Sequence, residues 1–306
     1  MGRSLGNSGH GPTNDECEMD GKHPRKPVHQ APIEQVYKES ANRPEATGQG
    51  LIMATGQPEK GAEIAELLAS IDRAKAELNA KRPLGPAALQ RIQDEFMVRY
   101  TYNSNAIEGS TLTLDETALV VLEGVSIGGK PLRHVLDAVG HSEAFNILLK
   151  RLKDGVALTE EFVKDMHYYV LMHSQTERGN YRINRVRISN SDVRLPDPEE
   201  VPGLMASLIE DIANSTLHPV EKAGVYHLDF EMIHPFIDGN GRTGRLLMNM
   251  LLMQQGYLPV DIKFSNRARY YSAFKSFQAT NSYDEMVVLI AEYELQELNE
   301  RLWMLG

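Results

Sequence analysis

The stretch at residues 234–245 brings together side chains whose types and spacing suit the binding of a polyphosphate. Gly239 and Gly241 have no side chains, so their backbone N–H groups can turn inward around an anion where a helix begins. Arg242 and Arg245 lie three residues apart and therefore share one face of a helix. Two guanidinium groups above a nest of backbone amides match a polyphosphate better than a single carboxylate. The pattern predicts an anion site at the start of this helix.

The same stretch supplies a candidate base and a candidate metal ligand. His234 carries an imidazole whose ordinary pKa is about 6.5, so it can accept a proton from an attacking hydroxyl at neutral pH. Asp238 offers hard oxygen donors, and one carboxylate together with substrate phosphates is the usual way in which proteins hold Mg²⁺. Asn240 can donate to a phosphate oxygen or hold the loop, and Phe236 is expected to be buried.

Each of these features has an ordinary structural explanation when it is taken alone. A His beside a Pro often packs in the fold, Gly-Asn-Gly is often a turn, and arginines three apart often lie on a solvated helix face. Their conjunction in one short stretch favours the anion site. The stretch is neither a Walker loop, because no Gly-Lys-Ser/Thr follows, nor a Rossmann fingerprint, because no parallel-strand pattern precedes it.

The sequence His-Pro-Phe-Ile-Asp-Gly-Asn-Gly-Arg-Thr-Gly-Arg at 234–245 resembles the Fic-domain signature at every defined position, and the resemblance extends over about residues 95–300. Fic proteins are helical and mostly transfer AMP from ATP to a protein hydroxyl, so the resemblance implies a protein adenylyltransferase that uses ATP and Mg²⁺. Fic relatives that phosphorylate carry Lys at the position of Gly241, so this Gly favours nucleotidyl transfer. The implied roles are the base for His234, the Mg²⁺ ligand for Asp238, the anion hole for Gly239, Asn240 and Gly241, the β-phosphate partner for Arg242 and the γ-phosphate partner for Arg245.

Residues 104–109, Ser-Asn-Ala-Ile-Glu-Gly, resemble the inhibitory motif of the same family. The resemblance implies that Glu108 holds Arg245, which removes the partner of the γ-phosphate and repels the incoming anion. The alternative is that Glu108 is an ordinary surface residue at a helix end. In some relatives the same glutamate supports the removal of AMP, so Glu108 could inhibit one reaction and catalyse its reverse.

Two further features concern the target and the base of the nucleotide. Tyr181–Leu195 alternates apolar and polar residues around an Asn-Ser-Asp turn, which predicts a short β-hairpin. The resemblance implies that this hairpin is a flap that clamps the target chain by backbone pairing, with Val186 or Ile188 over the site. It also implies that Tyr270 and Tyr271 border the nucleotide, although a Tyr on an apolar helix face is more often part of the core.

Hydrophobic periodicity predicts an all-α body that carries these residues. A first helix begins at Ala62, and a second, which would carry the inhibitory motif, covers about 87–108, with Pro86 in its first turn and Gly109 at its end. Thr159 is a predicted N-cap. Further amphipathic helices are expected at about 133–151, 159–174, 200–214, 219–233, 242–255, 267–279 and 283–304. With the resemblance, the expected architecture is a Fic-type helical bundle with a short β-hairpin flap.

Composition limits the functional classes. Thirty-two Lys and Arg against 42 Asp and Glu give the 306 residues a net charge of −10, which disfavours broad binding to nucleic acid or an anionic membrane. The single Cys17 excludes an intrachain disulfide and a Cys-based zinc cluster. The chain shows neither a membrane-span run of apolar residues nor a secretory signal, so we expect a cytoplasmic protein. Residues 1–60 are predicted to be a mobile extension and 61–306 the catalytic unit, with its core at about 130–300.

The leading hypothesis is therefore an autoinhibited protein adenylyltransferase whose partner is a target protein, or the chain itself. Two alternatives stay open: a deAMPylase of AMP-modified protein, and a nucleotide-sensing regulatory module with little turnover. A homodimer is a further open question at this stage.

Overall fold

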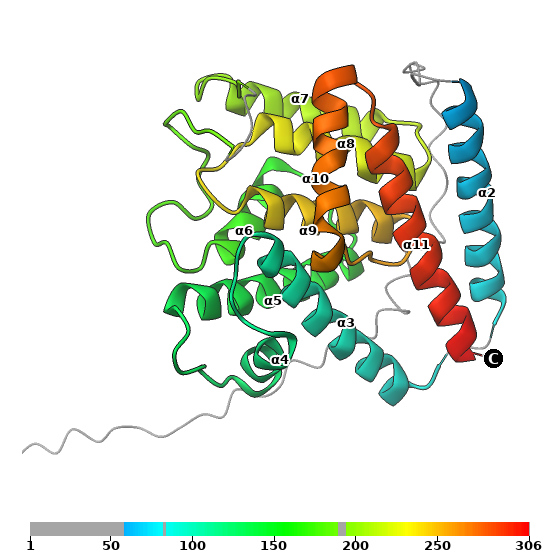
Figure 1. The fold of residues 1–306 in the computed structure, drawn as a ribbon, viewed down its shortest axis with the longest axis horizontal. Helices are drawn as coiled ribbons and strands as arrows, with labels where there is room; N and C mark the ends of the chain where they lie inside the picture. The colour runs from blue at the N-terminus through cyan, green and yellow to red at the C-terminus, as the bar shows by residue number, and fades with distance from the viewer. Residues whose placement is uncertain (1–57, 82–83, 189–193, 306) are drawn as a thin grey trace, which may run out of the picture.

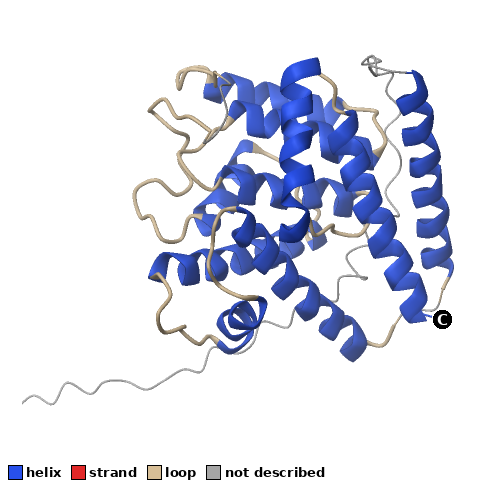
Figure 2. Ribbon diagram, in the orientation of Figure 1, coloured by secondary structure: helices blue, strands red, loops and turns tan. Residues whose placement is uncertain are grey.

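The computed structural model describes residues 58–81, 84–188 and 194–305, and these residues form a helical body (Figures 1 and 2). The predicted all-α class is confirmed, since the described residues contain ten α-helices and one 3₁₀-helix. The mobile extension predicted at residues 1–60 lies outside the described residues except for its last three positions, which are helical. The helices are α2 (Pro58–Ala80), α3 (Pro86–Ile107), α4 (Leu114–Glu123), α5 (Leu132–Lys153), α6 (Glu160–Val170), α7 (Val201–Asn214), α8 (Pro219–Ile233), α9 (Asn240–Gln254), η1 (Phe264–Asn266), α10 (Arg267–Thr280) and α11 (Asp284–Leu305).

The predicted helix ends agree with the local chemistry of the chain. Pro86 and Pro219 occupy the first turns of α3 and α8, where a missing N–H costs nothing. The hydroxyl of Thr159 accepts a hydrogen bond from the N–H of Phe162 at 3.1 Å and caps α6. α3 ends before Gly109, whose φ of 89° an L side chain would rarely adopt.

Helix α4 was not among the helices expected from periodicity. It begins with a capping box, in which the Thr113 hydroxyl accepts from the N–H of Glu116 and the Glu116 carboxylate accepts from the N–H of Thr113. This Thr-x-x-Glu pattern is readable in the sequence and could have located the helix. α4 packs on α3 and α5, so it supports the end of the helix that carries Glu108.

Helices α8 and α9 form the centre of the molecule, and α9 is buried along almost its whole length. α8 packs against α7, α9 and α11, whereas α9 packs against α5, α6 and α8. α2 lies along α11 at one side of the body (Figure 1). The loop that joins α8 to α9 therefore leaves one buried helix and enters another, which fixes both of its ends.

The predicted hairpin differs from the described structure. Residues 181–188 and 194–195 form no strand, and the intervening turn lies outside the described residues. At the start of this limb, the backbone N–H of Arg182 bonds to the carbonyl of Pro235 in the α8–α9 loop, at 2.9 Å. Val186 and Ile188 are half-buried in this extended limb.

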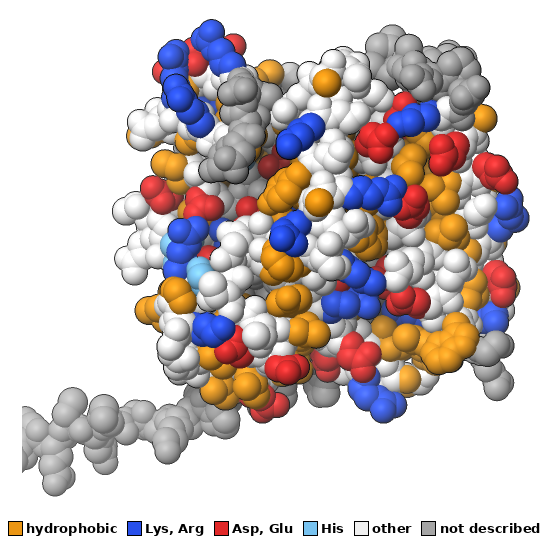
Figure 3. Space-filling view, in the orientation of Figure 1, with side chains coloured by type: hydrophobic (Ala, Val, Ile, Leu, Met, Phe, Trp, Pro, Cys, Tyr) orange, Lys and Arg blue, Asp and Glu red, His pale blue; other side chains and the backbone are white. Residues whose placement is uncertain are grey.

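The surface carries charges of both signs. Figure 3 shows basic and acidic side chains close together over the face formed by α3, α10 and α11. One such pair joins Arg99 of α3 to Glu297 of α11, with Nη2 and Oε1 at 2.6 Å. None of the helices among the described residues is long and apolar enough to cross a membrane.

Candidate functional site

The loop between α8 and α9 carries the signature residues. His234 follows α8 with a φ of 50°, and Gly239 precedes α9 with a φ of 77°. Both values lie in the left-handed region, where a residue with a side chain is strained. Because Gly239 has no side chain, it cannot cap the N–H groups of the first turn of α9 in the way that a Ser or Asp would. An uncapped helix N-terminus is where an anion binds most favourably.

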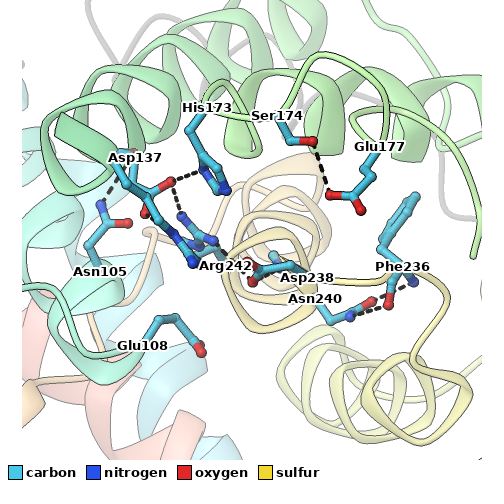
Figure 4. A network of polar contacts seen from close by, with 12 residues as sticks. Asn105, Glu108, Asp137, His173, Ser174, Glu177, Phe236, Asp238, Asn240 and Arg242 are labelled. Carbon is cyan, nitrogen blue, oxygen red and sulfur yellow. Dashed lines mark hydrogen bonds and ion pairs between the residues drawn. The ribbon is translucent and has the colours of Figure 1, made fainter. Parts of the chain in front are cut away.

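Asn240 closes this loop on itself. Its Oδ1 accepts from the N–H of Phe236 at 2.9 Å, and its Nδ2 donates to the carbonyl of Phe236 at 2.8 Å (Figure 4). Phe236 is fully buried, as predicted. Of the two roles considered for the Asn240 side chain, the structure shows the loop-holding one.

His167 of α6 supports the loop through a hydrogen bond and through ring stacking. The N–H of Gly179 donates to its Nδ1 at 2.9 Å, so the Nε2 carries the hydrogen and donates to the carbonyl of Asp238, also at 2.9 Å. The ring stacks on Phe236 with centroids 3.6 Å apart. Burial lowers the pKa of His167 to about 4, so this ring is neutral at pH 7 and serves as a fixed donor.

Arg182 ties the extended limb to the same loop. Its Nε donates to the carbonyl of His234 at 2.8 Å, and its Nη2 donates to the carbonyl of Pro196 at 2.7 Å. The side chain is buried, so these bonds replace the water that the carbonyl of His234, after the end of α8, and the carbonyl of Pro196 would otherwise require.

His234 is held in the protonation state that a base requires. Burial lowers its pKa from the ordinary value of 6.5, and the nearby charge of Arg182 acts in the same direction. Its Nδ1 lies 3.4 Å from the main-chain carbonyl of Glu231, one turn earlier on α8. The ring is therefore neutral at pH 7, and its other nitrogen is the one left for a substrate.

Arg242 is fixed by a network centred on Asp137 of α5, which Figure 4 shows between Asn105, His173 and Arg242. Asp137 Oδ1 lies 2.8 Å from Arg242 Nη1 and 2.7 Å from His173 Nδ1. Arg242 is 1% exposed, and its Nη2 also lies 3.4 Å from Asp238 Oδ1. A buried guanidinium that is already oriented can bind an anion with little further ordering.

Asp238, the predicted metal ligand, keeps its charge. Burial raises the pKa of its carboxyl, but the positive charges of Arg242 and Arg133 lower it. The net effect is a pKa below the usual value. Oδ1 accepts from the N–H of Gly239 at 2.6 Å, and Oδ2 pairs with Nη2 of Arg133 at 2.5 Å. Arg133 is half-exposed, so it can leave this contact more easily than the buried Arg242.

Arg245 contacts the segment that resembles the inhibitory motif. Its Nη2 lies 2.9 Å from Oε1 of Glu108, and the same nitrogen donates to the carbonyl of Ser104 at 2.8 Å. Its Nε donates to the Ser104 hydroxyl at 3.1 Å. Burial would lower the pKa of Arg245, but Tyr270 and Glu108 raise it more, so the guanidinium stays charged. The end of α3 and the start of α9 are thus joined by an ion pair between the buried Arg245 and the half-exposed Glu108.

Gly241 makes room for this pair. A Cβ at this position would lie 2.2 Å from Oε1 of Glu108 and 3.0 Å from Nη1 of Arg245. Any side chain here would push Glu108 away from Arg245. Close packing against Glu108 and Arg245 is therefore a second reason for a glycine at position 241, in addition to the backbone freedom predicted from the sequence.

The two tyrosines of α10 lie differently. Tyr270 is buried, accepts from Nη1 of Arg245 at 3.3 Å and lies 2.7 Å from Nε2 of His227. Tyr271 is half-exposed, and its hydroxyl donates to the carbonyl of Ile107 at 3.0 Å. Tyr270 thus supports Arg245 from within the core, and Tyr271 remains the candidate for contact with the nucleotide.

Several residues that build the site carried no assigned role in the sequence analysis. The motif predicted the α8–α9 loop itself. The residues that hold this loop in place lie in α5, in α6 and in the extended limb, which are distant from it in the chain. A single His, Arg or Asp gives no pattern that a sequence can reveal, because its partners are either main-chain carbonyls, as for His167 and Arg182, or side chains that are distant in the chain, as for Arg133. These supports are Arg133, Asp137, His167, His173 and Arg182.

Comparison with known proteins agrees with this geometry. The family model described as "Fic/DOC family" matches residues 157–252. A protein adenylyltransferase Fic of Nematostella vectensis is 35% identical over 211 residues, which are 67% of this chain and 49% of that protein. One from Drosophila willistoni is 36% identical over 213 residues, or 68% of this chain and 42% of that protein. The chain spans about half the length of the curated relatives it matches.

Solved structures show the same fold. Fic-1 from C. elegans superposes with a TM-score of 0.73 at 28% identity, covering 81% of this chain and 74% of that one. A Fic-domain signalling protein from Bacteroides thetaiotaomicron gives 0.70 at 25% identity, covering 77% and 97%.

Proposed function

This chain belongs to the Fic/DOC family, and from that premise we propose that it is a protein adenylyltransferase. The observation that carries the proposal is the α8–α9 loop, where a neutral His234 lies beside an uncapped helix N-terminus flanked by Arg242 and Arg245. This arrangement combines a base with an anion site for a triphosphate. Names of the related proteins, protein adenylyltransferase Fic, point to the same reaction.

In the proposed reaction, the hydroxyl oxygen of a target Ser, Thr or Tyr attacks the α-phosphorus of ATP. The bond between that phosphorus and the α–β bridging oxygen breaks, and pyrophosphate leaves. His234 takes the hydroxyl proton through Nε2, since Nδ1 faces the Glu231 carbonyl. The N–H groups of Asn240 and Gly241 and the guanidinium of Arg242 stabilise the charge on the phosphates, and the N–H of Gly239 would join them only on leaving Asp238.

Mg²⁺ fits the donor chemistry of Asp238. Its carboxylate is half-exposed, stays charged and lies next to the proposed phosphate site. Proteins usually bind Mg²⁺ through one or two carboxylates when substrate phosphates supply further ligands. Bound Mg²⁺ would neutralise phosphate charge, and Arg133 would have to release Oδ2 for that purpose.

We propose that the structure is the inhibited state. The ion pair between Glu108 and Arg245 occupies the guanidinium proposed for the γ-phosphate. ATP that enters must either displace Glu108 or bind with its phosphates misaligned. A coupling of about 1–3 kcal/mol would reduce transfer roughly 5–150-fold.

DeAMPylation is the second candidate, because Glu108 presents a half-exposed carboxylate beside the same site. There Glu108 would orient water toward the phosphodiester. The third is a nucleotide sensor that binds ATP without turnover. The target protein, self-modification and a cytoplasmic location remain predictions, as does the role of Val186 and Ile188 in holding the target, and a homodimer remains an open question.

The test compares AMP incorporation from α-labelled ATP with Mg²⁺ and a cell lysate. Glu108→Gly should raise labelling above wild type, and adding His234→Ala should abolish it. Glu123→Gly is a matched control, because Glu123 is also an exposed Glu that directly precedes a left-handed Gly at a helix end. Nucleotide-dependent thermal stabilisation without labelling in any variant would instead support the sensor.

A further inference from the structure

We propose that Glu231 is a positioning residue for His234, and that Gly244 is required because it makes room for the Glu231 carboxyl. The proposal deepens the proposed function, on which its kinetic part rests. Glu231 lies one turn before His234 on α8, and Gly244 faces it from α9.

The carboxyl of Glu231 is buried and incompletely bonded. The residue is 7% exposed, and its Oε1 is sealed from solvent and has no hydrogen-bond partner among the residues that the structure describes. An unpaired buried carboxyl oxygen costs free energy, so it needs a reason. Its other oxygen, Oε2, lies 3.8 Å from Nδ1 of His234. Hydrogen bonds at catalytic groups are often long before the substrate is bound and shorten afterwards.

Gly244 leaves the space that this carboxyl occupies. A Cβ at position 244 would lie 2.6 Å from Oε1 of Glu231, 3.0 Å from a ring carbon of Phe230 and 3.1 Å from a ring carbon of His227. Gly244 also lies inside a buried helix, where Gly is less favourable than Ala by about 1 kcal/mol. Gly at position 244 therefore makes the helix less stable than Ala would. The space that Glu231 needs explains why a glycine is present despite this loss of stability.

The electrostatic setting keeps the carboxyl able to accept a hydrogen bond. Burial raises the pKa of Glu231 to about 8, and the charge of Glu108 acts in the same direction. At pH 7 the group is neutral, so it adds no negative charge where ATP must bind. Its carbonyl-type oxygen still accepts from an N–H.

The consequence concerns which nitrogen of His234 carries the hydrogen. The main-chain carbonyl of Glu231 is 3.4 Å from Nδ1, which is a long hydrogen bond. With Oε2 as a second acceptor, the Nδ1–H tautomer is favoured, and Nε2 is left as the base. Glu231 never touches the substrate in this account, so it acts only through His234.

The first test follows the tautomer by ¹⁵N NMR of the His234 ring in the Glu108→Gly protein. We expect the Nδ1–H tautomer there and with Glu231→Gln, which keeps an acceptor oxygen. Glu231→Val should shift the ring toward the Nε2–H tautomer. This measurement needs no activity, so it holds even if the proposed function fails. A persistent Nδ1–H tautomer in the Val variant would mean that the main-chain carbonyl suffices, and would overturn the proposal.

The second test measures AMP transfer in the same background. Glu231→Val should lower kcat on the order of 100-fold, the scale of a misplaced catalytic group, with KM for ATP unchanged. Glu231→Gln should restore kcat. Asp229→Asn is the matched control, because Asp229 is a partly buried acid of the same helix that bonds to Tyr283 away from the site. No labelling in the Glu108→Gly parent would contradict the proposed function rather than this inference.

The Gly244→Ala variant tests independently whether Gly244 makes room for Glu231. Alone it should lower kcat as Glu231→Val does, because the new methyl displaces the carboxyl. In the Glu231→Val background it should change kcat little, since the effects of contacting residues are not additive. Additive losses in the double variant would contradict the pairing of Glu231 with Gly244.

Discussion

At the scale of single residues, the site depends on side chains that stay in one protonation state. His167 and His234 are both kept neutral by burial, and the Asp238 carboxylate is kept charged by two arginines. A neutral imidazole is a base, and a charged carboxylate is a metal ligand. The local surroundings thus assign each group its chemistry before any substrate arrives.

The pH dependence of transfer follows from His234. Its pKa lies below the ordinary 6.5, so the base is lost only when the pH falls below that value. We expect kcat/KM of the Glu108→Gly variant to stay flat from pH 7.5 down to about 6.5 and to decline in more acid solution. A decline that already begins above pH 7 would show that His234 is not the group that titrates.

At the scale of elements, close helix contacts hold the supports of the loop in place. α5 and α6 approach each other at Gly140, where a Cβ would lie 2.1 Å from the carbonyl oxygen of Tyr169. These two helices carry Asp137 and His167, which orient Arg242 and Asp238. The contact between them therefore sets the distance between the two sides of the anion site.

Gly140→Ala should destabilise the protein by about 1–3 kcal/mol, because the backbone oxygen it meets cannot move aside. The matched control is Gly203→Ala on α7, where the added methyl meets open space. That variant should be unchanged or slightly more stable. Urea unfolding of both variants checks the difference, and equal stability would refute the close contact.

Helix α11 contains a buried acid, Glu294, that makes the stability of the fold depend on pH. Glu294 is fully buried, and burial raises its pKa to about 8, against about 4.3 in an unfolded chain. The stability that the neutral group contributes is complete below pH 4.3 and is lost as the pH rises to 8.

Glu294→Gln cannot ionise, so its stability relative to wild type should increase between pH 5 and 8 by up to about 1.4 kcal/mol per pH unit. Urea unfolding at several pH values measures this slope. Glu66→Gln, at an exposed position of α2, is the control and should show no such trend. A parallel pH dependence of wild type and Glu294→Gln would mean that Glu294 is already charged.

The sequence predicted the helices well where apolar periodicity was long, as in α3 and α8, and where Pro or Thr marked their starts. It missed α4, whose signal is a capping box rather than a long periodic pattern. The motif predicted the α8–α9 loop, whereas the contacts that supports such as Arg182 make with it were not predicted. Arg182 bonds to main-chain carbonyls, which look alike in every sequence.

At the scale of the whole molecule, α3 is held so that its end reaches the site. Asn103 donates to the buried carboxylate of Asp261 at 2.8 Å, and Arg99 pairs with the same carboxylate at 3.0 Å. Arg99 also pairs with Glu297 of α11. The helix that precedes Glu108 is thus fixed to the body away from the ATP site, and this attachment holds Glu108 next to Arg245.

The central claim is that the α8–α9 loop gathers the phosphates of ATP beside His234. The most direct measurement is a crystal structure of Glu108→Gly with Mg²⁺ and a non-hydrolysable ATP analogue. We predict the phosphates on the N–H groups at the start of α9, with the γ-phosphate on Arg245 in place of Glu108 and the α-phosphate facing His234. Phosphates bound elsewhere, with residues 234–245 facing away from them, would contradict the account.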